Sequence, residues 1–209
     1  MTGQATADNL GTRKAVAKVP YGAKNPDGSD RYTSPETVVV DLAHPDKILY
    51  TLPISQASGA FDPASGRMNI VGNDPQTNDR GLWQSAPVGQ NPSWGNTLQS
   101  SGTFQGKLNG GRESQIVALP NGKGFLLVGA AKGEPIRGVV ASTPEGLLGA
   151  EPKDLGGQLP DTQYPYGPTI TDIKEIDGRE FVTLRLSTFG LPKGFYDPHT
   201  YTSTFDVTP

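Results

Sequence analysis

An internal repeat with a period of 57 residues (137 − 80 = 57) constrains this chain more than any single residue does. Arg80-Gly-Leu-Trp-Gln-Ser-Ala-Pro87 and Arg137-Gly-Val-Val-Ala-Ser-Thr-Pro144 match without a gap, as Arg-Gly-apolar-apolar-x-Ser-x-Pro. In the same register, Val71-Gly72 corresponds to Val128-Gly129. A fixed period of this length indicates that one structural unit is used repeatedly.

Short apolar runs separated by frequent turn residues favour an all-β chain. The 209 residues include 27 Gly and 19 Pro, which break helices and mark turns. Asn121-Gly122 lies between apolar runs at residues 114–119 and 125–128, and Asp177-Gly178 lies between runs at 169–176 and 180–186. Both dipeptides predict β-hairpins, because a type I′ turn needs positive φ at its two central residues.

Each repeat unit is predicted to hold about four antiparallel strands. Strands are expected at 57–61, 68–71 and 82–85 in the first unit, at 114–119, 125–128, 138–142 and near 147–155 in the second, and at 169–176, 180–186 and 200–207 in the third. Four-stranded units of this kind build β-propellers. We therefore expect a single domain with a propeller-like array of blades at about 54–110, 111–165 and 166–209, preceded by an N-terminal extension and partial blade at 1–53.

Three units and a partial one are few for a ring, since propellers usually have four to eight blades. Three explanations stay open: a small or incomplete ring, another chain that completes it, or a piece of a longer product. The alternative fold is a β-sandwich in which the two similar hairpins are coincidental.

Two segments resemble a motif of known propellers. Ser142-Thr-Pro-Glu-Gly-Leu-Leu148, with Glu145 offset and no Trp, and the looser stretch from Trp83-Gln-Ser85 to Ser93-Trp94 resemble the Ser-x-Asp-x-Gly-x-x-Trp "Asp box" of sialidase-like propellers. The chain is similar in general style to bacterial propeller glycosidases such as actinobacterial endo-arabinanases. In those families the box braces a turn, so the resemblance implies a fold rather than an activity, and it implies turn-bracing roles for Ser85 and Ser142.

Charge and composition exclude several function classes. A net charge of −3, without a cluster of Lys and Arg, argues against a nucleic-acid surface. The chain has no Cys, which excludes disulfides and thiol catalysis, and its two histidines, His44 and His199, cannot make a multi-His metal site. No cofactor or metal is expected; the alternative is calcium in the acidic loop at 73–79.

Paired carboxylates are the remaining candidates for catalysis, because glycoside cleavage needs one acid and one base or nucleophile. Glu113 enters an apolar strand after Gly-Gly-Arg112, and Asp172 interrupts a run of β-branched residues. We expect these two acids to be catalytic if there is catalysis, with Arg112 holding a substrate group. The structural alternative is a solvated or turn-capping role for each acid.

Aromatic residues give the second signal for a glycan. Tyr164-Pro-Tyr166-Gly-Pro168 is a stiff segment that leads into the strand at 169–176. Sugar rings stack on aromatic faces, so Tyr164 and Tyr166 are predicted to bind substrate. The alternative is that the prolines only stiffen a connector.

Two hypotheses follow. In the first, the chain is a secreted or cell-envelope propeller that recognises carbohydrate, with glycoside hydrolysis of cell-wall polysaccharide as its catalytic form. In the second, it is a non-catalytic structural or interaction module of a surface or phage-tail assembly, in which another chain completes the propeller. No run is long enough to span a membrane. The N-terminus lacks the apolar core of a signal peptide, so export through that route would require a processed product.

Overall fold

The computed structural model describes residues 10–13, 36–91, 93–131, 134–155, 165–190 and 197–208. This part of the chain is all-β and has no helix of seven or more residues. It holds four antiparallel sheets, each with its strands in chain order. We number them sheet I to sheet IV.

Sheet I contains β1 (Leu10–Arg13), β2 (Glu36–Asp41) and β3 (His44–Leu52). Sheet II contains β4 (Ser55–Asp62), β5 (Arg67–Asn73), β6 (Arg80–Gln84) and β7 (Gln99–Thr103). Sheet III contains β8 (Ser114–Ala118), β9 (Phe125–Gly129), β10 (Arg137–Ala141) and β11 (Lys153–Asp154), and sheet IV contains β12 (Pro165–Ile176), β13 (Arg179–Gly190) and β14 (Asp197–Asp206). Single 3-10 turns lie between strands: η2 (Val88–Gln90), η3 (Trp94–Thr97), η4 (Gly106–Leu108), η5 (Pro120–Gly122) and η6 (Glu145–Leu148).

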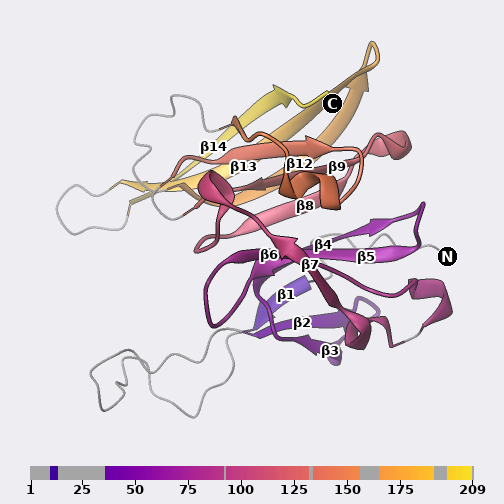
Figure 1. The fold of residues 1–209 in the computed structure, drawn as a ribbon. Coiled ribbons are helices and arrows are strands. Elements are labelled where there is room, and N and C mark those ends of the chain that lie inside the picture. The colour runs from indigo at the N-terminus through magenta and orange to yellow at the C-terminus, as the bar shows by residue number, and fades with distance from the viewer. Residues whose placement is uncertain are drawn as a thin grey trace, which may run out of the picture.

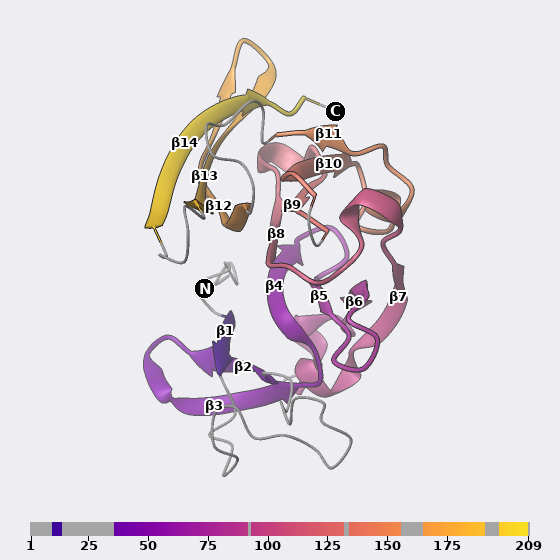
Figure 2. The ribbon, with the colours of Figure 1, turned by 90° about the vertical axis from the view of Figure 1, so that its left-hand side faces the viewer.

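The sheets are stacked in chain order, from sheet I at the bottom of Figure 1 to sheet IV at the top. Turning the molecule shows β4, β8 and β12 on the inner side of the resulting arc and β7 and β11 on its outer side (Figure 2). The first strand of each sheet contacts the first strand of the next, from β1 through β4 and β8 to β12. None of the sheets is closed into a barrel.

Three apolar clusters lie between neighbouring sheets and hold the stack together. Ile70 packs between sheets I and II, Leu127 between sheets II and III, and Leu184 between sheets III and IV. All three side chains are at most 1% exposed. The sheets are therefore joined face to face by apolar burial, which is the main source of stability for such layers.

Both predicted hairpin turns are confirmed. Asn121 and Gly122 have φ of 56° and 69°, and Asp177 and Gly178 have φ of 52° and 77°. Positive φ is the conformation for which Asn-Gly and Asp-Gly are selected. The predicted fourth strand at 147–155 is mostly wrong: η6 covers its start, and β11 has only two residues.

The repeated motif lies on the third strand of its sheet in both copies, but the side chains do not face the same way. Val71 pairs with Leu82 in sheet II, whereas Val139 of sheet III pairs with Leu127 and not with Val128. The connection before β10 holds seven residues where the one before β6 holds six, so the pairing moves by one position. A one-residue shift turns every side chain to the opposite face. Leu82 accordingly packs toward the following sheet and Val139 toward the preceding one.

Candidate functional site

A cleft of about 610 Å³ opens where the first strands of three sheets meet. Its walls are residues 57–61 of β4, 114–118 of β8 and 168–173 of β12. Each of these strands stands at the end of its own sheet, so one edge of each has no strand paired to it. Edge strands present backbone N–H and C=O groups that no ladder satisfies. Each of the three strands therefore brings an edge without a ladder partner to the cleft, although side chains bond the N–H groups of Ile116 and Ile170.

Two side chains of the cleft tie neighbouring first strands together. Ser58 Oγ accepts a hydrogen bond of 2.8 Å from the backbone N–H of Ile116, and Gln115 Oε1 accepts one of 2.5 Å from the N–H of Ile170. Ser58 and Gln115 are 57 residues apart (115 − 58 = 57), which is the period of the repeat. The same kind of contact, a side-chain oxygen that accepts a backbone N–H of the next first strand, thus occurs twice along the chain. The acceptor is a hydroxyl group in one copy and an amide group in the other.

Asp172 is the one ionisable side chain among the described residues that line the cleft. Its Oδ2 atom lies 2.7 Å from Lys174 Nζ, and the two side chains are 42% and 68% exposed. The hydrogen bond to Asp172 raises the pKa of Lys174. Asp172 thus lies in a segment of β12 that lines a cleft, and its catalytic role stays a prediction.

Glu113 and Arg112, the other predicted pair, lie just before β8 and outside the residues that line the cleft. Glu113 Oε1 accepts a hydrogen bond from Gln56 Nε2 at 3.4 Å, while its Oε2 atom is buried without a hydrogen bond. The backbone carbonyl of Arg112 accepts hydrogen bonds from the side chains of Asn73 and Arg80. This segment joins sheets II and III, and of the two predicted acids only Asp172 is among the residues that line the cleft.

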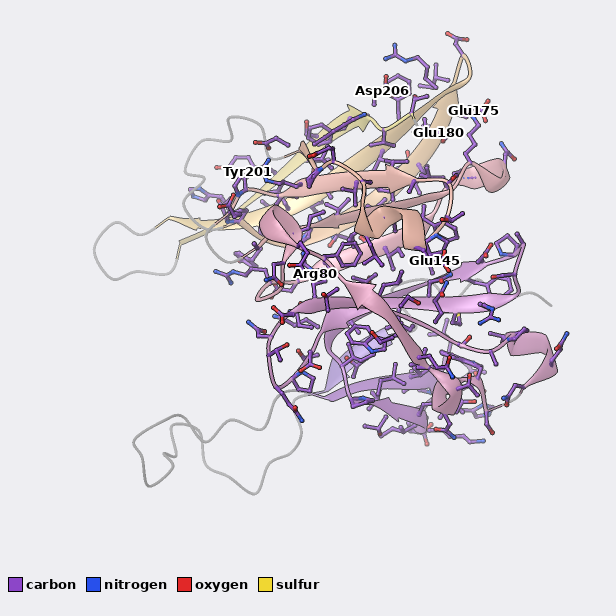
Figure 3. All side chains as sticks on the ribbon, viewed as in Figure 1. Arg80, Glu145, Glu175, Glu180, Tyr201 and Asp206 are labelled. Carbon is purple, nitrogen blue, oxygen red and sulfur yellow. The ribbon has the colours of Figure 1, made fainter. Side chains whose placement is uncertain are left out.

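Arg80 lies buried at the centre of the contact between sheets II and III (Figure 3). The sequence analysis did not identify it as a functional residue. Its side chain is 0% exposed and donates to the carbonyl oxygens of Leu108, Arg112 and Ala130 at 2.7, 2.9 and 2.9 Å. Burial lowers the pKa of Arg80 to about 10, and the charge of Glu113 opposes that shift. The guanidinium therefore remains a cation at neutral pH and bridges β6 to η4 and to the segments before β8 and after β9.

Of the two tyrosines predicted to bind substrate, the structure describes one. Tyr166 lies at the start of β12, paired with Ser187, and is half-buried outside the residues that line the cleft. Tyr164 lies outside the described residues. Phe61 is the aromatic side chain that the described cleft does contain.

The turns that resemble Asp boxes differ from each other. Ser85 is 1% exposed; its Oγ accepts from the N–H of Met68 and donates to the carbonyl of Ala86, so it braces a turn as predicted. Ser142 is exposed, and the hydrogen bond in its turn runs from the N–H of Gly146 to Thr143 Oγ1.

The acidic loop at 73–79 uses its first carboxylate to hold its own backbone. Asp74 Oδ1 accepts hydrogen bonds from the N–H groups of Thr77 and Gln76, and these bonds lower the pKa of Asp74. Within the described ranges, no group of three or more His, Cys, Asp or Glu could hold a metal ion. The calcium alternative stays a prediction.

A charged joint connects the hairpin ends of sheets III and IV. Lys123 Nζ lies 2.9 Å from Glu180 Oε1, whose side chain is 0% exposed, and 3.0 Å from Glu175 Oε2. Asn121 also donates to Glu175. Both glutamates lie at the end of the long β12–β13 hairpin (Figure 3). These contacts raise the pKa of Lys123, chiefly through Glu180, and lower the pKa of Glu175, chiefly through Lys123.

We expect Lys123→Ala to lower the melting temperature, because it leaves the carboxylate of Glu180 buried without its cation. The pKa of Glu175 is depressed in the folded state, so its stabilisation is present above about pH 4.3 and is lost as the pH falls through the folded value. The pKa of Lys123 is raised, so its share is lost only as the pH rises above about 10.5. Melting curves of both proteins from pH 3 to 11 should therefore differ most near neutrality. Lys174→Ala, which removes an exposed pair, is the control and should change the melting temperature less.

Comparison of the chain with known proteins found no match among protein-family models, curated proteins or solved structures. Among the described residues, no helix is long and apolar enough to cross a membrane.

Proposed function

We propose that this chain is a carbohydrate-recognising module whose ligand lies in the cleft between β4, β8 and β12. The observation that carries the proposal is the lining of that cleft, in which the edges of three strands meet the hydroxyl groups of Ser58, Thr169 and Thr171, each of which makes one hydrogen bond to the backbone and keeps further capacity for a ligand. A glycan presents many hydroxyl groups that both donate and accept hydrogen bonds, which suits a wall of backbone N–H and C=O groups. Phe61 adds an apolar surface for a sugar ring.

In this proposal the four sheets are blades of an open propeller-like array. Support comes from the inner position of the first strands and from the repeated joint made by Ser58 and Gln115 (Figure 2). Propeller blades meet through their inner strands around a shared axis, and ligands bind near that axis. We place the module outside the cell or in the cell envelope, where polysaccharide is found.

We propose binding without cleavage. Glycoside hydrolysis uses two carboxyl groups that flank the bond, about 5–10 Å apart. The described lining of the cleft supplies Asp172 alone, while Glu113 is held by Gln56 at the joint of sheets II and III. A single carboxylate can orient a ligand but cannot act as both acid and base.

The second candidate is the interaction module, in which a sheet of another chain packs against sheet I. Sheet I and its β2–β3 hairpin expose three large apolar side chains: Leu42 is 62% exposed, and Ile48 and Leu49 are each 42% exposed. The strand β3 is also an edge strand of this sheet. Exposed apolar side chains beside a free strand edge favour pairing with another chain.

One experiment separates the two candidates. Isothermal titration with neutral, cationic and acidic cell-wall oligosaccharides should show binding of at least one class, with no release of reducing ends. Glu113→Gln should leave this affinity unchanged, because Glu113 does not line the cleft. The absence of any glycan binding, together with a stable oligomer in sizing with light scattering, would reject the carbohydrate function and favour the interaction module. Release of sugars that Glu113→Gln abolishes would reject binding without cleavage.

A further inference from the structure

We infer that the cleft selects neutral and amino glycans over acidic ones, and that Asp172 sets this preference. The inference rests on the proposed carbohydrate function and names the ligand class for the same site. Its basis is the charge of the lining: residues 57–61, 114–118 and 168–173 contain one carboxylate and no Lys or Arg.

An acidic sugar would lose hydration of its carboxylate in this cleft without gaining a cationic partner from the described residues that line it. Proteins that bind carboxylates use Arg or Lys, because these groups donate charge-assisted hydrogen bonds. Lys174, which is paired with Asp172, is not among the residues that line the cleft. Two unit charges about 4 Å apart change an equilibrium constant by about fivefold in water, and by more where water is excluded.

An amino sugar meets the opposite situation. Its ammonium group can share Asp172 with Lys174, since a carboxylate has two oxygens and about four acceptor positions. Lys174 occupies Oδ2 in the structure and is 68% exposed, so it can move away at low cost. The hydroxyl groups of the sugar then keep the same backbone partners as those of a neutral glycan.

The remaining polar side chains of the lining are the neutral hydroxyl and amide groups of Ser58, Ser114, Gln115, Thr169 and Thr171, so none of them supplies a charge that offsets this preference. Ser58 Oγ and Gln115 Oε1 accept the N–H groups of Ile116 and Ile170, and are engaged in holding the strands. Arg80, the large buried cation nearby in the fold, points its donors at three carbonyl groups and is not part of the lining. Asp172 is thus the specificity-determining charge.

The test uses tetrasaccharides of glucosamine, N-acetylglucosamine and galacturonic acid in calorimetric titrations with the full chain. The expected affinity is highest for the amino sugar, intermediate for the neutral sugar and at least fivefold lower than neutral for the acidic sugar. Asp172→Asn should reduce the ratio of amino to acidic affinity by about tenfold or more. Lys174→Ala should increase the ratio, because it removes the competitor for Asp172.

Asp177→Asn is the matched control. It removes the same charge from the same sheet at a turn residue outside the lining, and Asn tolerates the φ of 52° at this position. Equal affinity for all three probes, or an unchanged ratio in Asp172→Asn, would overturn the inference and leave the carbohydrate function standing. Binding of none of the three would overturn both. A melting curve that matches the curve of the unsubstituted protein shows that a variant is folded.

Discussion

Arg80→Ala is expected to lower the free energy of unfolding by about 4 kcal/mol, which is a large share of a typical total of about 5–15 kcal/mol. The change leaves the carbonyls of Leu108 and Ala130 without the donor that Arg80 supplies, leaves the Arg112 carbonyl with Asn73 as its remaining donor, and opens a cavity between sheets II and III. For a chain of this length, the melting temperature should fall by about 10 °C. Urea titrations followed by circular dichroism, with the slope of the transition fitted separately, measure the loss.

The repeat provides the control for this experiment. Arg137 occupies the matching position in sequence, but its side chain is 13% exposed and contacts Glu134 at 3.5 Å. Arg137→Ala should cost about 1 kcal/mol, in the range of a partly exposed pair. Arg80→Lys keeps the charge but not the planar fork, and should fall between the two. Equal losses in Arg80→Ala and Arg137→Ala would show that the three carbonyl contacts do not carry the joint.

Gly110→Ala is expected to cost about 3 kcal/mol, at the upper end of overpacking effects. A Cβ atom at this position would lie 1.7 Å from the carbonyl oxygen of Asn78 and 2.8 Å from the backbone nitrogen of Arg80. Backbone atoms cannot rotate away, so the loop before β8 must shift and carry the Arg112 carbonyl away from Arg80. Denaturant titration of the single variant measures the cost.

The matched control for that change is Gly149→Ala. A Cβ atom added to Gly149 meets nothing within 4 Å, so the substitution should alter stability by less than about 1 kcal/mol. Because Gly110 and Arg80 act on the same carbonyl, the double variant should lose less than the sum of the two single losses. Strict additivity would contradict the proposed route through Arg112.

Local signals in the sequence predicted the strands well. Asn121-Gly122 and Asp177-Gly178 determine their turns through backbone sterics alone, and both hairpins form where these residues stand. The repeated motif correctly identified a recurring third strand. It did not predict side-chain orientation, because the pairing register depends on the length of the connection between strands.

The candidate site was harder to predict, since it depends on which segments the packing brings together. An arginine at the start of a strand is usually solvated, and nothing local shows that Arg80 meets carbonyls 28 to 50 residues later. Glu113 precedes β8 and Asp172 lies within β12, yet only Asp172 is among the residues that line the cleft. The 57-residue period could have pointed to these contacts. Ser58 and Gln115 are one period apart, and so are Gln56 and Glu113.

The division of the apolar core into three separate interfaces has a consequence for how the molecule comes apart. Sheets II and III each bury two faces, whereas sheets I and IV each bury one, so cooperativity passes only between nearest neighbours. Unfolding should then fray inward from both terminal sheets, and the central pair should be the last to melt. On heating, β12 of sheet IV should therefore unfold before β4 and β8, which belong to the central sheets. The cleft would then lose one of its three strands, and ligand binding would be lost at a lower temperature than the central core.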